Sequence, residues 1–309
     1  MDEGDEDVAT EQAPLLGGSW GAGIPISGAY GLGTPALGLY NNRMHMVYRG
    51  LTGNQLFMSS LYNGSWGSPF AIPNILSRVT PALTTFGNRM MMVYPHSLTN
   101  RYMMSFYDGN GWSPAEELGE AFSGNLSPAL SFFGGRAHMV YRGLGNQLFA
   151  TSYDGNGWGN PFAITGAFSR VTPSLGVYNN RLNLIYPSLF NNNLALASYN
   201  GFGWGSPTLL PNLYSPWSPG LGLYNNSLAA IYPTSLGLGG LGGWGGYGGY
   251  GGGGGYGLDW SLFDGNAWGP GSVLSGFQST YSPALASYGN ALNMVYPGLN
   301  NQLYWSSCH

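Results

Sequence analysis

The chain has 309 residues, among them 53 Gly and 20 Pro, while charged residues make up only 7% and aromatic residues 15%. This is not the composition of a disordered chain, which combines low hydrophobicity with high net charge. The formal net charge is −4 and all nine basic residues are Arg, which excludes the broad basic face that nucleic acid binding requires. No apolar run approaches the ~18 residues of a membrane-spanning helix, so no membrane insertion is predicted.

Residues 1–19 are predicted to form an acidic, disordered tail, because six of the 13 acidic residues lie in the first 12 positions. This start lacks the basic and apolar segments of a secretory signal. Asn63, Asn125 and Asn225 nevertheless begin sequons that a secreted protein would use for glycosylation. The localisation therefore stays open. Cys308 is the only cysteine, which excludes an intrachain disulfide.

From residue 20 to the end, the chain is dominated by a repeat that tryptophan marks. The tryptophans are Trp20, Trp66, Trp112, Trp158 and Trp204, spaced by 46 residues, and then Trp268 after a step of 64. The longer step contains the Gly-rich tract 236–257. The chain therefore holds six copies, one of which carries an insertion.

Each copy contains four short apolar segments separated by turn residues. In the copy that starts at Trp66, these segments are residues 66–72, 80–86, 89–95 and 101–107. Asn-Asn or Gly-Asn pairs separate the second and third segments, and Asp-Gly-Asn-Gly precedes two of the tryptophans, which predicts tight turns. Four strands in about 45 residues are typical of a β-propeller blade. We therefore predict that residues 20–309 form a single all-β domain, a six-bladed β-propeller with four antiparallel strands per blade.

The turn before each tryptophan predicts the order of the strands within a blade. It pairs the tryptophan strand with the preceding strand, so the tryptophan strand is the outer, fourth one. The longer stretch that follows, residues 73–79 in one copy, then crosses to the inner strand of the next blade. The chain ends without an outer strand for the last blade, and we expect residues 20–26 to fill that place and close the ring. The repeated tryptophans are expected to pack mainly between blades.

One long segment is almost duplicated, since residues 48–81 return as residues 141–173 in alternate blades. A sequence selected for core packing alone should recur in all six copies, so this one indicates binding. Its loops are expected to meet on one face beside an inter-blade cleft. The predicted ligand-binding residues are Tyr48, Arg49, Asn54, Gln55, Trp66 and Arg78, their counterparts Tyr141, Arg142, Asn146, Gln147, Trp158 and Arg170, and His45 and His138.

Guanidinium and amide groups in this arrangement suit the recognition of hydroxyl, acetamido or carboxylate groups. The alternative is structural: the arginines cap carbonyls between blades and the histidines pack within strands. In the other four copies Pro follows the Tyr instead of Arg, as in Tyr94-Pro95. Weak or absent sites are therefore expected there.

The segments SPALASYGNALNMVYPG, MVYRG…GNQLF and YDGNGW, at a spacing of about 46 residues, resemble the tandem-repeat β-propeller lectins of mushrooms and bacteria. The resemblance covers nearly everything from Trp20 to the end of the chain. It implies multivalent binding of glycans or glycoproteins in pockets between or beside blades, and some members prefer N-acetylglucosamine-type sugars. The ligands expected for this chain are N-acetylglucosamine or acidic sugars. Several weak sites on one molecule can raise avidity by roughly 10²–10⁴. The chain departs from the pattern by lacking the Arg in four copies and by its Gly-rich insertion.

Catalysis finds little support in the sequence. The four histidines form no metal-like cluster with the single cysteine and no Ser-His-Asp pattern, so no catalytic residue, metal or cofactor is predicted. Glu116, Glu117 and Glu120 form an acidic cluster that is expected to be solvated, although paired carboxylates can hydrolyse glycosides. We predict a lectin that is not an enzyme. The alternative is a self-assembling extracellular structural protein, because a surface with few charges is poorly soluble; homo-oligomerisation is left open.

Overall fold

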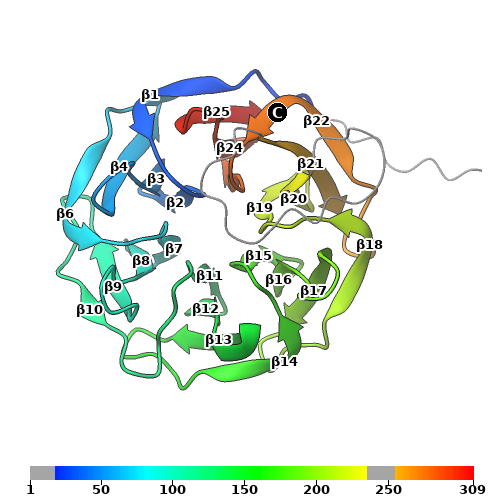
Figure 1. Ribbon diagram of the computed structural model, residues 1–309, viewed down its shortest axis with the longest axis horizontal. Helices are drawn as coiled ribbons and strands as arrows, with labels where there is room; N and C mark the ends of the chain where they lie inside the picture. The colour runs from blue at the N-terminus through cyan, green and yellow to red at the C-terminus, as the bar shows by residue number, and fades with distance from the viewer. Residues whose placement is uncertain (1–17, 235–254) are drawn as a thin grey trace, which may run out of the picture.

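The computed structural model describes residues 18–234 and 255–309, which form six four-stranded antiparallel sheets around a central axis (Figure 1). The predicted six-bladed β-propeller is confirmed. The predicted acidic tail lies outside the described residues except for positions 18 and 19. Most of the Gly-rich tract 236–257 also lies outside them, between two paired strands of the fifth blade.

The blades are numbered along the chain, and their strands run from the axis outward in the same order. The inner strands are β2 (Ala36–Tyr40), β7 (Ala82–Phe86), β11 (Ala129–Phe133), β15 (Ser174–Tyr178), β19 (Gly220–Tyr224) and β23 (Ala284–Tyr288). The second strands are β3 (Arg43–Arg49), β8 (Arg89–Pro95), β12 (Arg136–Arg142), β16 (Arg181–Pro187), β20 (Ser227–Thr234) and β24 (Ala291–Pro297).

The third strands are β4 (Gln55–Tyr62), β9 (Tyr102–Tyr107), β13 (Gln147–Tyr153), β17 (Asn193–Tyr199), β21 (Tyr256–Phe263) and β25 (Gln302–Cys308). The outer strands are β6 (Phe70–Leu76), β10 (Glu116–Glu117), β14 (Phe162–Phe168), β18 (Thr208–Tyr214), β22 (Ser272–Ser279) and, in blade six, β1 (Ile24–Tyr30). Blade one also contains the two-residue β5 (Ser65–Trp66), and a single 3₁₀ turn, η1 (Leu144–Asn146), precedes β13.

The second strand of each blade is buried on both sides, because neighbouring blades pack against its two faces. In β8, for example, Met90, Met91, Met92 and Val93 have no exposed surface. The inner strands approach the adjacent blade so closely that small residues are required: a Cβ at Gly38 would lie 2.7 Å from Met90 Sδ. The hydrophobic core is therefore a series of inter-blade layers arranged around the axis.

The N-terminal segment closes the ring, as the sequence predicts. Trp20 pairs with Cys308, and β1 pairs with β25, so the first and last strands lie side by side in blade six (Figure 1). Buried Gln302 fixes this contact, since its Nε2 donates hydrogen bonds to Ile26 O at 2.7 Å and to Ala29 O at 2.9 Å. The closing strand extends to Tyr30, beyond the predicted limit at residue 26.

The outer strands differ from the prediction. Trp66 pairs only briefly with β4, and the long outer strand is β6, which includes most of the stretch that was expected to be an inter-blade loop. Pro73 and Asn74 suggested a loop, but Asn74 has a φ of 61° and lies at a bulge of β6. A bulge accommodates such residues and protects an edge strand from pairing with another chain.

The topology gives the ring two distinct ends. One end carries the loops between the second and third strands and the loops between blades, such as residues 50–54 and 77–81; we call it the seam face. The other end carries the turn after each inner strand and the turn before each tryptophan, such as residues 87–88 and 108–111; we call it the turn face. A second strand of seven residues separates the two faces by about 20 Å.

Candidate functional site

The duplicated segment places two loops in contact on the seam face. In blade one, Ser77 N donates a hydrogen bond to Asn54 O at 2.9 Å, which joins the loop after the outer strand to the loop between the second and third strands. Leu32 N donates to Arg49 O at 3.0 Å, so the loop that enters the blade meets the same point. Three segments of chain therefore converge around Arg49.

Arg49 is half-buried at this junction, and its guanidinium lacks hydrogen-bond acceptors among the described residues. Its Nε is buried and has no hydrogen-bond partner among the described residues. The ion pairs in the described part of the chain join Arg101 to Glu117 and Glu120, and Arg136 to Asp154, so none includes Arg49 or the exposed Arg78. A buried donor without an acceptor costs about 1–3 kcal/mol.

Arg142, the counterpart of Arg49 in blade three, is held by the protein itself. Its Nη1 donates to Arg170 O at 3.0 Å and to Asn146 Oδ1 at 3.3 Å, while its Nη2 donates to Asn125 Oδ1 at 2.8 Å. Asn125 lies in the loop that enters blade three, at the position that Leu32 occupies before blade one. The two copies thus differ because one entering loop supplies a side-chain acceptor and the other does not.

The predicted Asn and Gln residues serve the backbone. Asn54 and Asn146 have φ values of 58° and 65°, in the left-handed region that Asn tolerates better than most residues. Gln55 Nε2 donates to Ile72 O at 2.7 Å, and Gln147 Nε2 donates to Ile164 O at 2.8 Å, next to the bulge of each outer strand. Gln302 makes the same kind of contact in blade six, so this Gln is part of the blade rather than of a site restricted to two copies.

The predicted aromatic residues lie in the core. Tyr48 is 3% exposed and stacks on Phe57 with ring centroids 5.7 Å apart, and Tyr141 stacks on Phe149 in the same way. Burial raises the pKa of both tyrosines to about 12. The indole of Trp66 packs in the layer between blades six and one, and that of Trp158 packs between blades two and three. These four residues support the seam but do not line it.

The structure does not bring the two histidines to the seam. His45 is 3% exposed and lies near the start of β3, about 13 Å along the strand from Arg49. Its Nε2 lies 3.2 Å from Tyr40 O and its Nδ1 lies 2.7 Å from Ser60 Oγ. His138 Nε2 lies 3.2 Å from Phe133 O in blade three.

Asn occupies the same position in blades four and six. Asn183 Nδ2 donates to Tyr178 O at 3.3 Å, and Asn293 Nδ2 donates to Tyr288 O at 3.2 Å. The shared task is to satisfy the last carbonyl of the inner strand. Sequence comparison of the copies could have revealed this, because His and Asn can both donate to one carbonyl.

Lowering the pH is expected to destabilise the protein through these histidines. Burial lowers the pKa of His45 and His138, and the neighbouring Arg43 and Arg136 lower it further. The unfolded chain therefore takes up protons below its ordinary His pKa of about 6.5 while the folded state does not, so stability is complete above that pH and falls as the pH decreases. The loss is at most ~1.4 kcal/mol per pH unit for each imidazole.

Denaturant unfolding of the wild type and of the His45→Asn/His138→Asn double variant between pH 7.5 and pH 5 checks this. The double variant copies blades four and six and should show a flatter pH profile than the wild type. Parallel profiles would contradict the assignment of the pH dependence to these two imidazoles.

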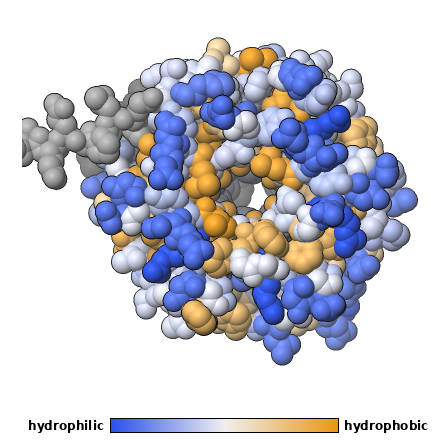
Figure 2. Space-filling view, turned by 180° about the vertical axis from the view of Figure 1, so that it is seen from behind, coloured by the Kyte–Doolittle hydropathy of each residue, from blue (hydrophilic) through white to orange (hydrophobic). Residues whose placement is uncertain are grey.

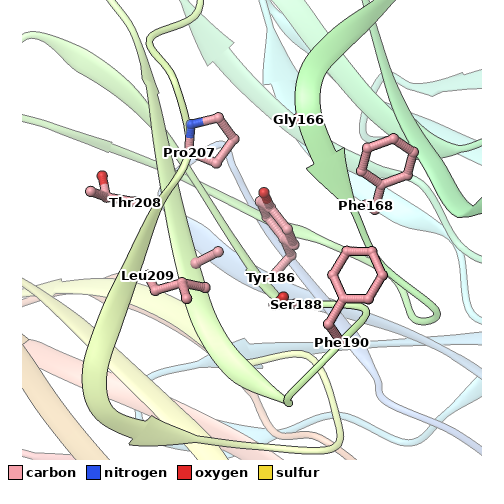
Figure 3. Close-up of a pocket in the computed structure, with 9 residues that line it drawn as sticks. Gly166, Phe168, Tyr186, Ser188, Phe190, Pro207, Thr208 and Leu209 are labelled. Atoms are coloured by element: carbon pink, nitrogen blue, oxygen red, sulfur yellow. The ribbon is translucent and has the colours of Figure 1, made fainter.

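A small aromatic hollow lies on the seam side of the junction between blades three and four. It has a volume of about 240 Å³ and lies between the end of β14 and the loop after β16 (Figure 3). Phe168 and Phe190 form one wall and Leu209 lies opposite, with Tyr186 between them (Figure 3). The Phe190 side chain is 83% exposed. Apolar walls with a few polar groups are typical of ligand pockets.

Sequence reasoning missed a further feature of the seam face. The loops between the second and third strands carry exposed apolar residues at their tips. These residues are Leu51, Leu98, Leu144, Phe190 and Leu299. In the sequence, each of these loops has an apolar residue in the middle of polar residues. These apolar side chains provide contact area beside the seams.

Figure 2 shows one face of the ring, with apolar residues gathered around the central opening and polar residues over most of the periphery. Within residues 18–234 and 255–309, no group of three or more potential metal ligands occurs. A search of the same residues finds no helix with the length and apolar character needed to cross a membrane.

Comparisons with known proteins establish the fold alone. The chain matches no protein-family model and no curated protein sequence. Similar solved structures include AofleA from Arthrobotrys oligospora, with a TM-score of 0.63, 13% identity, and coverage of 93% of this chain and 85% of that one. The Aleuria aurantia lectin in complex with Fucα1-6GlcNAc has a TM-score of 0.61 and 12% identity, with coverage of 88% and 91%.

The Hadza microbial sialidase Hz136 is similar to the same degree, with a TM-score of 0.63, 12% identity, and coverage of 92% of this chain and 68% of that one. The prediction that the protein is not an enzyme is therefore wrong, because it excluded the glycosidases that are similar to this chain in structure. It relied on the absence of a catalytic pattern in the sequence, whereas the fold is shared by lectins and by propeller glycosidases. The architecture is that of a six-bladed propeller whose similar solved structures include both classes.

Proposed function

We propose that the protein is a carbohydrate-binding β-propeller whose principal site is the seam around Arg49. The observation that carries the proposal is the half-buried Arg49 side chain, whose guanidinium has no hydrogen-bond or ion-pair partner among the described residues. Sugar hydroxyl, acetamido and carboxylate oxygens are suitable acceptors. The presence of lectins among the similar solved structures supports this class of ligand.

The charge of the seam favours sugars with an acidic group. Arg49 and Arg78 bring two positive charges to blade one, and no ion pair within the described part of the chain neutralises them. A planar guanidinium binds a carboxylate through two parallel hydrogen bonds. The exposed Leu98 lies in the next loop, which contacts the end of β6 through Ser97 N and Leu76 O, and it offers apolar area to the ring of a sugar.

The copy in blade three is proposed to be a weaker site. A ligand there would have to displace the bonds that Arg142 makes to Asn125 and to Arg170 O. The adjacent aromatic hollow offers compensating contact area. Two unequal sites on one ring would still increase avidity for a surface that presents many glycans.

A glycan array followed by calorimetry with the free sugar tests the proposal. The Arg49→Met variant keeps the apolar stem but removes the donors, and we expect its affinity to fall about tenfold, which corresponds to roughly one charged hydrogen bond. Its thermal stability should be unchanged, because Arg49 has no protein partner to lose. Equal affinity of the wild type and Arg49→Met would contradict a site at this seam.

Release of product from the retained glycans should be measured in the same experiment. Turnover would place the protein with the propeller glycosidases rather than with the lectins. Arg181→Met is the control for the binding measurement, because it removes an exposed guanidinium at the start of β16, on the turn face and about 20 Å from the seam face.

A further inference from the structure

Four arginines outside the seam face share one repeated position. Arg43, Arg89, Arg136 and Arg181 each begin the second strand of their blade, directly after the turn that follows the inner strand. They therefore lie on the turn face, about 20 Å from the seam arginines. Blades five and six have Ser227 and Ala291 at this position.

In each of the first three blades, this arginine contacts the end of the third strand or the turn before the tryptophan. Arg43 Cζ lies 4.4 Å from the ring centroid of Tyr62, and Arg89 Cζ lies 4.0 Å from that of Phe106. In blade three, Arg136 Nη2 lies 3.9 Å from Asp154 Oδ2. Cation–π contacts of this kind fix a guanidinium while leaving its N–H donors available to other acceptors.

The turn in blade two is held rigidly. Asp108 Oδ1 accepts hydrogen bonds from Asn110 N at 2.8 Å and from Gly111 N at 3.1 Å. Tyr40 of the preceding blade donates from its hydroxyl to Asp108 O at 2.7 Å. The two backbone donors, and then the charge of Arg89, lower the pKa of Asp108, so its carboxylate is ionised at neutral pH. No hydrogen bond from the described residues reaches its Oδ2, which is available to a ligand.

These groups surround an open cavity of about 380 Å³. Arg89, Phe106, Asp108, Asn110 and Trp112 line it. The cavity therefore combines donors, an acceptor, an amide and an aromatic side chain, a set that recognises the hydroxyls and the apolar face of a sugar.

We propose that this cavity is a second carbohydrate-binding site, selective for neutral sugars that present two adjacent hydroxyls to Asp108 and Arg89. The carboxylate accepts from one hydroxyl and the guanidinium donates to the other. Asp108 and Arg89 carry opposite charges, so the cavity has no net charge to attract an acidic sugar, and the carboxylate repels one. This selectivity is opposite to that of the seam, where positive charge is not balanced.

Blade three repeats the arrangement with Arg136, Asp154 and Trp158, although there the arginine already contacts the carboxylate. Sites on both faces of one ring have a consequence that a one-faced lectin lacks. A single molecule can bridge two glycan-bearing surfaces without forming an oligomer. The second site does not depend on the seam, because it shares no residue with it.

The test uses NMR of the tryptophan indole N–H groups in the full chain, with the Trp112 signal assigned from a Trp112→Phe variant. Titration with a panel of neutral monosaccharides should shift the Trp112 signal. The shift should weaken at least tenfold in Asp108→Asn and in Arg89→Met. Asp108→Asn keeps the turn, because Asn200 Oδ1 accepts the equivalent backbone hydrogen bonds from Phe202 N and Gly203 N in blade four.

Two outcomes would overturn the proposal: no neutral sugar shifts the Trp112 signal, or the shift is unchanged in Asp108→Asn. A monosaccharide whose adjacent hydroxyl is methylated should bind more weakly than its parent. The Arg49→Met variant separates this site from the seam, since it should lose binding of acidic or acetamido sugars while the Trp112 response to neutral sugars persists.

Discussion

Deletion of residues 1–30 is expected to open the ring and to lower the free energy of unfolding by about 5 kcal/mol. The deletion removes β1, whose Ile26 and Ala29 are 2% and 0% exposed. It also removes the carbonyls that accept hydrogen bonds from the buried Gln302. Because domains are stable by only about 5–15 kcal/mol, this loss is a large fraction of the total.

The matched control is a chain that begins at Gly18, which keeps every contact described for Trp20 and β1. Denaturant unfolding of the two truncated chains and the full chain gives the comparison, and size-exclusion chromatography reports aggregation through the exposed edge of β25. Similar stability of the two truncated chains would show that blade six does not need its N-terminal strand.

Arg142→Met is expected to lower the free energy of unfolding by about 2 kcal/mol, whereas Arg49→Met should change it by less than about 0.5 kcal/mol. Arg142 joins the loop that enters blade three to the loop that leaves it, through Asn125 and Arg170 O. Its removal leaves these acceptors without a charged donor. Arg49 occupies the same position but has no such bonds, so its removal relieves an unsatisfied Nε.

Thermal and denaturant unfolding of both variants in one buffer checks the difference. A Leu32→Asn variant provides a further control, because it gives Arg49 the acceptor that Asn125 gives Arg142. This variant should be more stable than the wild type and should bind sugar more weakly. If Arg49→Met is destabilised as strongly as Arg142→Met, both arginines are structural and the seam proposal loses its basis.

Much of the fold could be predicted because each blade repeats the same local sequence pattern. Tryptophan at a constant spacing indicated the number of blades, and the lack of an outer strand after β25 indicated closure by the segment that begins at Trp20. The outer strands were harder, because Pro73 and Asn74 in the middle of β6 are read as loop residues by local rules. Only the pairing with β4 reveals that they lie at a bulge.

The site could be predicted less well, because its decisive differences are non-local. Arg49 and Arg142 lie in nearly identical segments, yet their environments differ through Leu32 and Asn125, which enter from another part of the chain. Gln55 and His45 suggested ligand contacts, but both satisfy backbone carbonyls within the blade. From the sequence alone, a residue that satisfies a backbone carbonyl cannot be distinguished from one that contacts a ligand, because the hydrogen-bond acceptor is not known.

For the arginines of the turn face, the sequence showed a repeated pattern but not the contacts that the arginines make. Their repetition was visible in the sequence, as the first residue of the same apolar segment in four copies, but nothing in it indicated what the arginines contact. The pairing of Met90 with Tyr107 brings the start of β8 to the end of β9 and so places Arg89 beside the Asp108 turn. Repetition alone did not reveal that contact.

The structure of the protein with the sugar that the array retains most strongly tests the account most directly. A sugar oxygen should lie within hydrogen-bond distance of the Arg49 guanidinium, in the seam between the loops at Leu32 and Ser77. A sugar bound only elsewhere on the ring, with Arg49 in contact with nothing but solvent, would contradict it.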